Sequence, residues 1–160
     1  DNNPVMFIEH QLLYNEKGVV PAEDYTIPFG EASVLRRGDD VTIVAWGPAV
    51  PDALTAAEQL ASENIQAEVI DLRTLVPLDR ETVVDSVIKT GRCVVVSQCV
   101  DIGSYTGEIV SQVTRDCFDY LDAPPVKVGA ENGIAPQAYT LEKAFLPDAD
   151  DILEAARSLI

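Results

Sequence analysis

The sequence predicts an α/β domain of three layers, in which a mostly parallel β-sheet lies between two layers of helices. Short segments that are apolar at nearly every position alternate with longer segments whose apolar residues recur every three or four positions. Strands that are apolar throughout are buried on both faces, which is typical of parallel strands joined by helical crossovers. The length of 160 residues suits one domain, and no Pro-, Ser- or Gly-rich linker divides the chain, so residues 1–160 are expected to form a single domain.

The amino-terminal quarter of the chain predicts little regular structure. Val5–Glu9 is an apolar run after Pro4 and is expected to form a buried strand. Residues 14–40 are interrupted by glycines and prolines, so we expect a long loop there, with one short strand near residues 32–36. Loops of this length usually pack on a neighbouring unit or carry function.

From residue 41 onward, strands and helices are expected to alternate. The expected strands are residues 41–46, 67–72, 93–96 and 126–128. The expected helices begin after Gly47-Pro48, at Asp79, after Gly103 and near Asp150. Asp79 is a suitable N-cap for the second helix, and Gly91 is suited to end it.

The charge of the chain is strongly negative, with 27 acidic and 11 basic residues and a formal charge of -16. This balance excludes a nucleic-acid-binding surface, which needs clustered Lys and Arg against the phosphates. The acidity has two interpretations: attraction to a basic protein partner, or simple solubility.

The cysteines and the hydropathy indicate the environment of the protein. Cys93, Cys99 and Cys117 form neither an even disulfide set nor a Cys-x-x-Cys pair, which indicates a reducing compartment. With one histidine, a zinc site is not expected. No apolar run is long enough to cross a membrane and no signal peptide is recognisable. The chain begins with Asp1 instead of Met, so we expect it to be part of a longer protein, with a processed amino terminus as the alternative.

The turns that precede helices give little sign of a nucleotide site. Gly47-Pro48-Ala49-Val50 lacks the further glycines of a Rossmann or phosphate-binding loop, and its proline removes an N–H. Gly103-Ser104-Tyr105-Thr106-Gly107 is a better anion candidate because it leads into a helix. Asp101 and Glu108 already place negative charge there, however.

Residues suited to nucleophilic catalysis are also few. His10 is the sole histidine, and no Gly-x-Ser-x-Gly elbow accompanies it, so we expect His10 to make a domain or subunit contact. Cys99 follows a strand end without a basic neighbour and is expected to be an inert thiol.

The most distinctive segment is Asp71-Leu72-Arg73-Thr74-Leu75-Val76-Pro77-Leu78-Asp79. One interpretation is a structural corner with an internal pairing of Asp71 and Arg73. The other is that Arg73 contacts a neighbouring domain or subunit.

This segment, with Ile70 before it, resembles the corner found in carboxy-terminal domains of the transketolase superfamily. Residues 7–14 resemble the opening of this domain in beta subunits of pyruvate, branched-chain 2-oxoacid and acetoin dehydrogenases, and residues 27–30 resemble the family's Ile-Pro-x-Gly step. Further similar motifs follow in the family's order at residues 106–109, 118–124 and 145–147. Where the family often has an acidic or His-Glu pair, this chain has Ser97-Gln98-Cys99-Val100-Asp101.

The resemblance implies a five-stranded mixed sheet whose first strand is antiparallel. It also implies that the intact enzyme is an oxidoreductase of a multienzyme complex and uses thiamine diphosphate and Mg. In this family the cofactor lies between the alpha subunit and the amino-terminal domain of the beta subunit. No catalytic, cofactor-binding or metal-binding role is therefore assigned to this chain, and the chain alone is expected to be inactive.

The role implied for the domain is assembly. It would help to hold an alpha-2 beta-2 heterotetramer together and would dock the basic subunit-binding module of the acyltransferase core. Residues 101–160 hold 11 acids against 4 bases, a net charge of -7, which fits such docking. Asp119, Asp122 and the terminal carboxylate of Ile160 are the candidate docking groups. The location implied is the bacterial cytoplasm or the mitochondrial matrix.

Two other hypotheses stay open at this point. The domain could belong to another superfamily member, such as deoxyxylulose-phosphate synthase or transketolase, or it could be a free-standing flavodoxin-like binding domain. The identity of the 2-oxoacid is not encoded here, since the pocket that selects it lies in the other domain.

Overall fold

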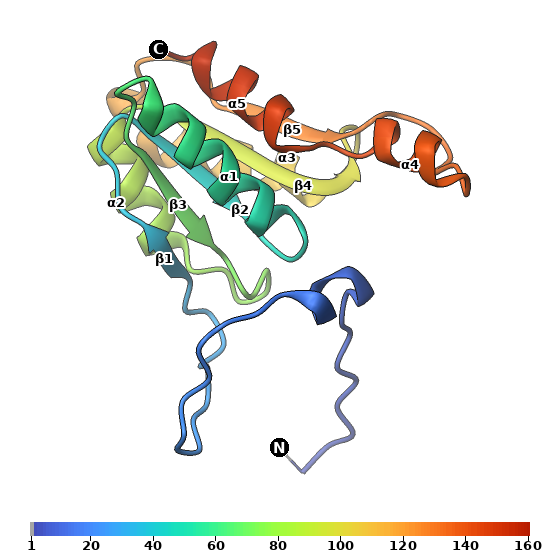
Figure 1. Ribbon diagram of the computed structural model, residues 1–160. Helices are drawn as coiled ribbons and strands as arrows, with labels where there is room; N and C mark the ends of the chain where they lie inside the picture. The colour runs from blue at the N-terminus through green and yellow to red at the C-terminus, as the bar shows by residue number, and fades with distance from the viewer. Residues whose placement is uncertain (1) are drawn as a thin grey trace.

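The computed structural model describes residues 2–160, which form one five-stranded sheet covered by helices on both faces (Figure 1). The strands are β1 (Ser33–Arg36), β2 (Val41–Ala45), β3 (Ala67–Asp71), β4 (Cys93–Val100) and β5 (Val126–Ala130). Their order across the sheet is β1-β3-β2-β4-β5, with β1 antiparallel to β3 and all other neighbours parallel. The predicted three-layer class and the antiparallel first strand are confirmed.

The helices pack in two pairs. Helices α1 (Ala49–Ser62) and α5 (Ala149–Arg157) cover one face, and α2 (Arg80–Thr90) and α3 (Tyr105–Cys117) cover the other. Alanines dominate the buried side of α1, which lets this helix approach the sheet closely. The remaining elements are short: η1 (Gln11–Asn15), η2 (Phe118–Tyr120) and α4 (Tyr139–Phe145). No helix in residues 2–160 has both the length and the apolar character needed to cross a membrane.

The predicted ends of α2 are confirmed. The Asp79 carboxylate accepts a hydrogen bond from the Thr82 N–H, which caps the first turn. Gly91 ends the helix in the left-handed conformation, with φ of 70°. The same Asp79 side chain accepts from the Ala32 N–H at 2.8 Å, so the cap also fixes the chain where it enters β1.

The predicted strand at Val5–Glu9 is wrong. Residues 5–9 have no regular secondary structure, and Ile8 is 86% exposed. Figure 1 shows this amino-terminal arm, residues 2–29, extending away from the sheet. A strand needs a neighbour for its N–H and C=O groups, and none of the five strands pairs with this segment. The short strand expected near residues 32–36 is confirmed as β1.

In the carboxyl-terminal half of the chain, one strand and one helix differ from the sequence prediction. Strand β4 continues to Val100 through an irregularity between Val96 and Val100, where its pairing with β5 shifts register. Helix α4 was not predicted, because it has only seven residues and none of them is buried, so no apolar stripe marks it.

The two ends of the sheet carry different segments of the chain. At the carboxyl end of the parallel strands lie the loops that follow β2, β3, β4 and β5, together with the amino-terminal arm. Trp46 lies here, and its ring meets Tyr105 of α3 edge-on, with ring centroids 6.5 Å apart. The Tyr105 hydroxyl donates to the Leu75 carbonyl at 2.8 Å, which ties α3 to the loop after β3. The amino end carries the β1–β2 turn, Arg92 and the segment before β5.

Candidate docking surface

The predicted docking residues Asp122 and Ile160 lie on segments that one arginine joins. Arg92 Nη2 is 3.1 Å from Asp122 Oδ2, and Arg92 Nε donates to the Leu159 carbonyl at 2.9 Å. Arg92 Nη1 donates to the Asp40 carbonyl at 3.2 Å. The guanidinium therefore fixes three segments at the amino end of the sheet, because its planar fork directs several N–H groups at once.

Asp122 is held by its backbone as well. Its N–H donates to the Gly91 carbonyl at 2.8 Å. A Cβ atom on residue 91 would lie 2.7 Å from Asp122 Oδ2, and the left-handed backbone of this residue favours glycine. The Asp122 side chain is still 60% exposed, which leaves it accessible to a partner. Asp119 lies on η2 and is exposed, and within residues 2–160 no basic side chain forms an ion pair with it.

An apolar groove lies beside these carboxylates and was not predicted from the sequence. Phe118 is 72% exposed and Tyr120 is 55% exposed. The groove has a volume of about 410 Å³ and is lined by Val110, Thr114, Phe118, Leu121, Asp122, Ala123, Pro124 and Pro125. We call residues 118–125 together with Ile160 the docking face. Aromatic side chains beside charged groups are typical of protein interfaces.

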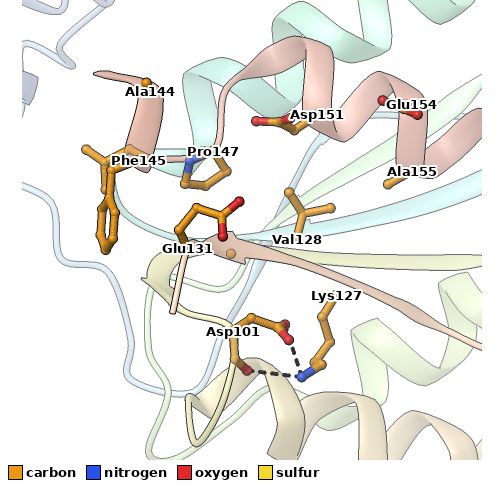
Figure 2. Close-up of a pocket in the computed structure, with 12 residues that line it drawn as sticks. Asp101, Lys127, Val128, Glu131, Ala144, Phe145, Pro147, Asp151, Glu154 and Ala155 are labelled. Carbon is orange, nitrogen blue, oxygen red and sulfur yellow. Dashed lines mark hydrogen bonds and ion pairs between the residues drawn. The ribbon is translucent and has the colours of Figure 1, made fainter. Parts of the chain in front are cut away.

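The other acids of residues 101–160 do not gather on this face. Asp116 is bound by Arg80 and Arg115, and these hydrogen bonds, Arg80 first, lower the pKa of its carboxyl. Asp101, Glu131, Asp151 and Glu154 line a separate hollow at the carboxyl end of β5 (Figure 2). The net charge of -7 predicted for one docking region is thus divided between the two ends of the sheet.

His10 lies on the amino-terminal arm, against the turn that follows β2. It lines a groove of about 520 Å³ together with Phe7, Ile8, Glu9, Leu13, Tyr14, Gly47 and Pro48. Its Nδ1 atom is buried and has no hydrogen-bond partner within residues 2–160. The contact of His10 with another domain or subunit stays a prediction.

Arg73 is exposed at the carboxyl end of the sheet and has a left-handed backbone, with φ of 55°. Its N–H donates to Asp71 Oδ1 at 3.0 Å, so the two residues interact through the Arg73 backbone. Burial raises the pKa of the Asp71 carboxyl, although the Arg73 N–H opposes this shift. The Gly30 N–H donates to Thr74 Oγ1 at 2.8 Å, so the corner also anchors the chain entering the domain. A contact of the Arg73 guanidinium with a neighbour stays a prediction.

The remaining candidates for chemistry are not assembled into a site. Cys93 is buried, which raises the pKa of its thiol to about 12. Cys99 is exposed beside the β4 irregularity, and its N–H donates to Ser97 Oγ. At the start of α3, Ser104 Oγ and Thr106 Oγ1 hydrogen-bond each other at 2.5 Å. In the part of the chain that the structure describes, no three His, Cys, Asp or Glu side chains are placed to hold a metal ion.

Comparison with known proteins places this architecture in a family. The profile of the family described as "Transketolase, C-terminal domain" matches residues 30–152. The chain belongs to this family, and the match begins where the amino-terminal arm ends.

Several relatives that are similar over nearly the whole chain are beta subunits. The chain is 43% identical to the pyruvate dehydrogenase E1 component subunit beta of Rickettsia felis, over 99% of this chain and 49% of that protein. It is 40% identical to the 2-oxoisovalerate dehydrogenase subunit beta of Bacillus subtilis, over 99% of this chain and 49% of that protein. It is 46% identical to the acetoin:2,6-dichlorophenolindophenol oxidoreductase subunit beta of Cupriavidus necator, over 98% of this chain and 46% of that protein. The chain spans about half the length of these curated relatives.

A solved structure supports the fold. The chain superposes on a structure titled "Split gene transketolase, inactive beta4 tetramer" with a TM-score of 0.72 and 32% identity, over 89% of this chain and 45% of that one.

Proposed function

We propose that this chain is the carboxy-terminal assembly and docking domain of the beta subunit of a thiamine-diphosphate-dependent 2-oxoacid dehydrogenase, an oxidoreductase acting on the oxo group of its donor. One observation carries the proposal: the three relatives above, at 40–46% identity over 98–99% of this chain, are beta subunits of oxidoreductases. The alternatives, another superfamily enzyme and a free-standing flavodoxin-like domain, are not favoured by these matches.

Substrate selection is assigned to the rest of the protein. Relatives named for pyruvate, 2-oxoisovalerate and acetoin all carry this domain at similar identity. A domain that occurs in relatives named for three different substrates is better suited to assembly than to substrate selection.

Thiamine diphosphate and Mg are also assigned to the rest of the intact enzyme. Mg²⁺ bound to a diphosphate needs oxygen ligands gathered at one point. The residues described here do not fit that requirement, because no such cluster of potential ligands is present in residues 2–160. Asp101 and Glu108 flank the helix start that would otherwise suit a diphosphate.

Exposed apolar side chains support a role in assembly. At the carboxyl end of the sheet, Val76 is 84% exposed, Ile102 is 71% exposed and Ile134 is 96% exposed. Surfaces of this kind are usually covered by another domain or subunit. We assign this end, with His10 and Arg73, to contacts within an alpha-2 beta-2 heterotetramer of the alpha subunit and a second beta subunit.

The docking face is assigned to the basic subunit-binding module of the acyltransferase core. Its carboxylates would attract the module, and its aromatic groove would bury apolar side chains. The three free thiols suit a reducing location, the bacterial cytoplasm or the mitochondrial matrix.

A binding titration tests the docking role. At low salt the 160-residue chain is expected to bind a purified acyltransferase subunit-binding module, and Asp119→Asn and Asp122→Asn should each weaken binding by about fivefold and lessen its salt dependence. Glu58→Gln, at an exposed position on α1, is the matched control and should bind as the wild type does. Equal binding by all variants would remove the docking assignment.

A second titration tests the placement of the cofactor. Isothermal calorimetry of the chain with thiamine diphosphate and Mg²⁺ should show no binding, and the chain alone should not decarboxylate pyruvate. Turnover by the chain alone would contradict the assignment of chemistry to the rest of the protein.

A further inference from the structure

Strand β5 is an edge strand, and no other strand in residues 2–160 pairs with its outer side. Alternate residues of a strand direct their N–H and C=O groups to opposite sides. The Ala130 carbonyl accepts from the Asp101 N–H at 3.1 Å, so residues 126, 128 and 130 face β4. The backbone groups of Lys127 and Gly129 therefore point outward.

One hydrogen bond within the chain is already made on this outer side, just beyond the end of β5. The Glu131 N–H, just beyond β5, donates to the Phe145 carbonyl at 3.1 Å. The next residue, Leu146, has an extended backbone, with φ of -88° and ψ of 143°. The last carbonyl of α4 thus accepts the outward hydrogen bond of Glu131, and the outward groups of Lys127 and Gly129 have no such partner in the part of the chain that the structure describes.

A hollow of about 360 Å³ borders these outward groups. Figure 2 shows Val128 pointing toward α5, while Lys127 points to the other side of the strand, where its ammonium meets Asp101. Lys127 Nζ is 3.0 Å from Asp101 Oδ1 and donates to the Asp101 carbonyl at 3.0 Å. A lysine on an edge strand usually blocks the addition of another strand. Here Asp101 holds the lysine side chain on one side of the strand.

Gly129, the other outward position of β5 besides Lys127, has no side chain that would hinder a pairing strand. A Cβ at this position would lie 2.7 Å from the Cys99 carbonyl, at the irregular part of β4. The register shift of β4 therefore requires glycine on β5.

The hollow is negatively charged. Four carboxylates and one ammonium line it, a formal charge of -3. Because Lys127 is paired with Asp101, the remaining charge comes from Glu131, Asp151 and Glu154. Glu131 and Glu154 are exposed and able to meet a cationic side chain.

We infer that the outer side of β5 binds an extended, basic segment of another protein, which adds to the sheet as a sixth strand. The outward groups of Lys127 and Gly129 supply the backbone hydrogen bonds, and the acids of the hollow select Lys or Arg side chains. A second copy of this chain is a poorer occupant, since the hollow beside its own β5 carries the same negative charge. The arm of the chain itself is also a poorer occupant, because its extended residues 5–9 contain Glu9 and no basic residue. The site lies at the carboxyl end of the sheet and is independent of the docking face.

Amide chemical shifts of the ¹⁵N-labelled 160-residue chain test the inference, with acetyl-Val-Lys-Val-Lys-Val-Lys-Val-amide as the probe. The peptide should shift the amides of residues 127, 129 and 131, and should leave those of β1, the other edge strand, unchanged. The same peptide with every backbone nitrogen methylated keeps its charge but cannot donate strand hydrogen bonds, and it should not bind. A peptide with Glu in place of Lys should not bind either.

Protein variants separate charge from backbone pairing. The double variant Glu131→Gln/Glu154→Gln should weaken binding of the lysine peptide by about fivefold, and Glu58→Gln should not change it. The inference is overturned if the methylated peptide binds as tightly as the parent, if the shifts map to β1 or to the docking face, or if the peptide does not bind at all.

Discussion

Arg92 joins segments that are distant in the sequence. Its side chain donates hydrogen bonds to Asp40 and Leu159 and forms an ion pair with Asp122. These partners belong to the β1–β2 turn, the residues after α5 and the segment before β5. Its side chain is 26% exposed, so these interactions are partly shielded from water. The position of the docking face thus depends on a residue outside it.

Replacing Arg92 with Met keeps most of the apolar stem and removes all three interactions. We expect the free energy of unfolding to fall by about 2 kcal/mol, because the carbonyls of Asp40 and Leu159 lose a charged donor. Urea denaturation followed by circular dichroism measures this. Arg115→Met is the control and should cost less than about 0.5 kcal/mol, since the exposed Arg115 leaves Asp116 paired with Arg80. An equal decrease in the free energy of unfolding of the two variants would show that the interactions of Arg92 contribute no more to stability than those of an exposed arginine.

Glu68 is a buried carboxylate on β3, with 3% of its surface exposed. Its Oε1 atom accepts from Lys89 Nζ at 2.6 Å and from the Gly38 N–H at 3.4 Å. Burial raises the pKa of this carboxyl, but the hydrogen bonds from Lys89, Ser86 and Gly38 outweigh burial, so the pKa lies below its ordinary value. A lowered pKa in the folded state stabilises the fold above the unfolded pKa, about 4.3, and this stability is lost as pH falls through the folded pKa.

Glu68→Gln should therefore lower the free energy of unfolding by about 1.5–3 kcal/mol at neutral pH. The difference between the variant and the wild type should shrink as the pH falls below the unfolded pKa, about 4.3, and through the lower folded pKa of Glu68. Denaturation at a series of pH values measures both effects. Parallel stability curves for the two proteins would contradict the role of Glu68.

The β1–β2 turn depends on close contact between backbones. A Cβ atom on residue 38 would lie 2.3 Å from the Ala67 carbonyl carbon, at the start of β3. Gly38→Ala should thus displace the turn and cost about 1–3 kcal/mol. Gly18, on the loop before β1, has no atom within 4 Å of the corresponding position, so Gly18→Ala should leave the thermal midpoint unchanged. A similar midpoint for the two alanine variants would show that the turn can relax.

The helices and strands of the core were predictable because burial imposes a pattern on the sequence. The strands β2 and β3 carry apolar residues at most of their positions, and Asp79 and Gly91 are recognisable caps. The apolar run at Val5–Glu9 carries a strand pattern too, but pattern alone does not supply a neighbouring strand. Helix α4 has no buried residue and so leaves no such pattern.

The candidate site was only partly predictable for a related reason. Acidic residues such as Asp119 and Asp122 can be counted in a sequence. The convergence of Arg92, Asp40 and Leu159 depends on tertiary contacts, and exposure of Phe118 is not distinguishable in sequence from burial. The open side of β5 follows from the strand order, which local patterns do not determine.

The molecule as a whole consists of a packed domain and an arm. Residues 5–8 are 70–86% exposed, and the family match begins at residue 30. Deleting residues 1–28 keeps the hydrogen bonds of Gly30 and Ala32 to Thr74 and Asp79. We expect the shortened chain to fold, with its free energy of unfolding changed by less than about 1 kcal/mol. Circular dichroism and urea denaturation measure this, and loss of cooperative unfolding would show that the arm belongs to the domain.

The pair formed by Trp46 and Tyr105 has a practical consequence for spectroscopy. Trp46 is the chain's single tryptophan, so tryptophan emission from the unlabelled protein, excited where tyrosine hardly absorbs, reports on one place. A five-residue strand spans about 17 Å, which is the approximate distance along β2 from Trp46 to the opposite end of the sheet. A ligand or subunit that binds near the loops after β2 and β3 should alter the tryptophan emission. A ligand bound beside Arg92 should leave the emission spectrum unchanged.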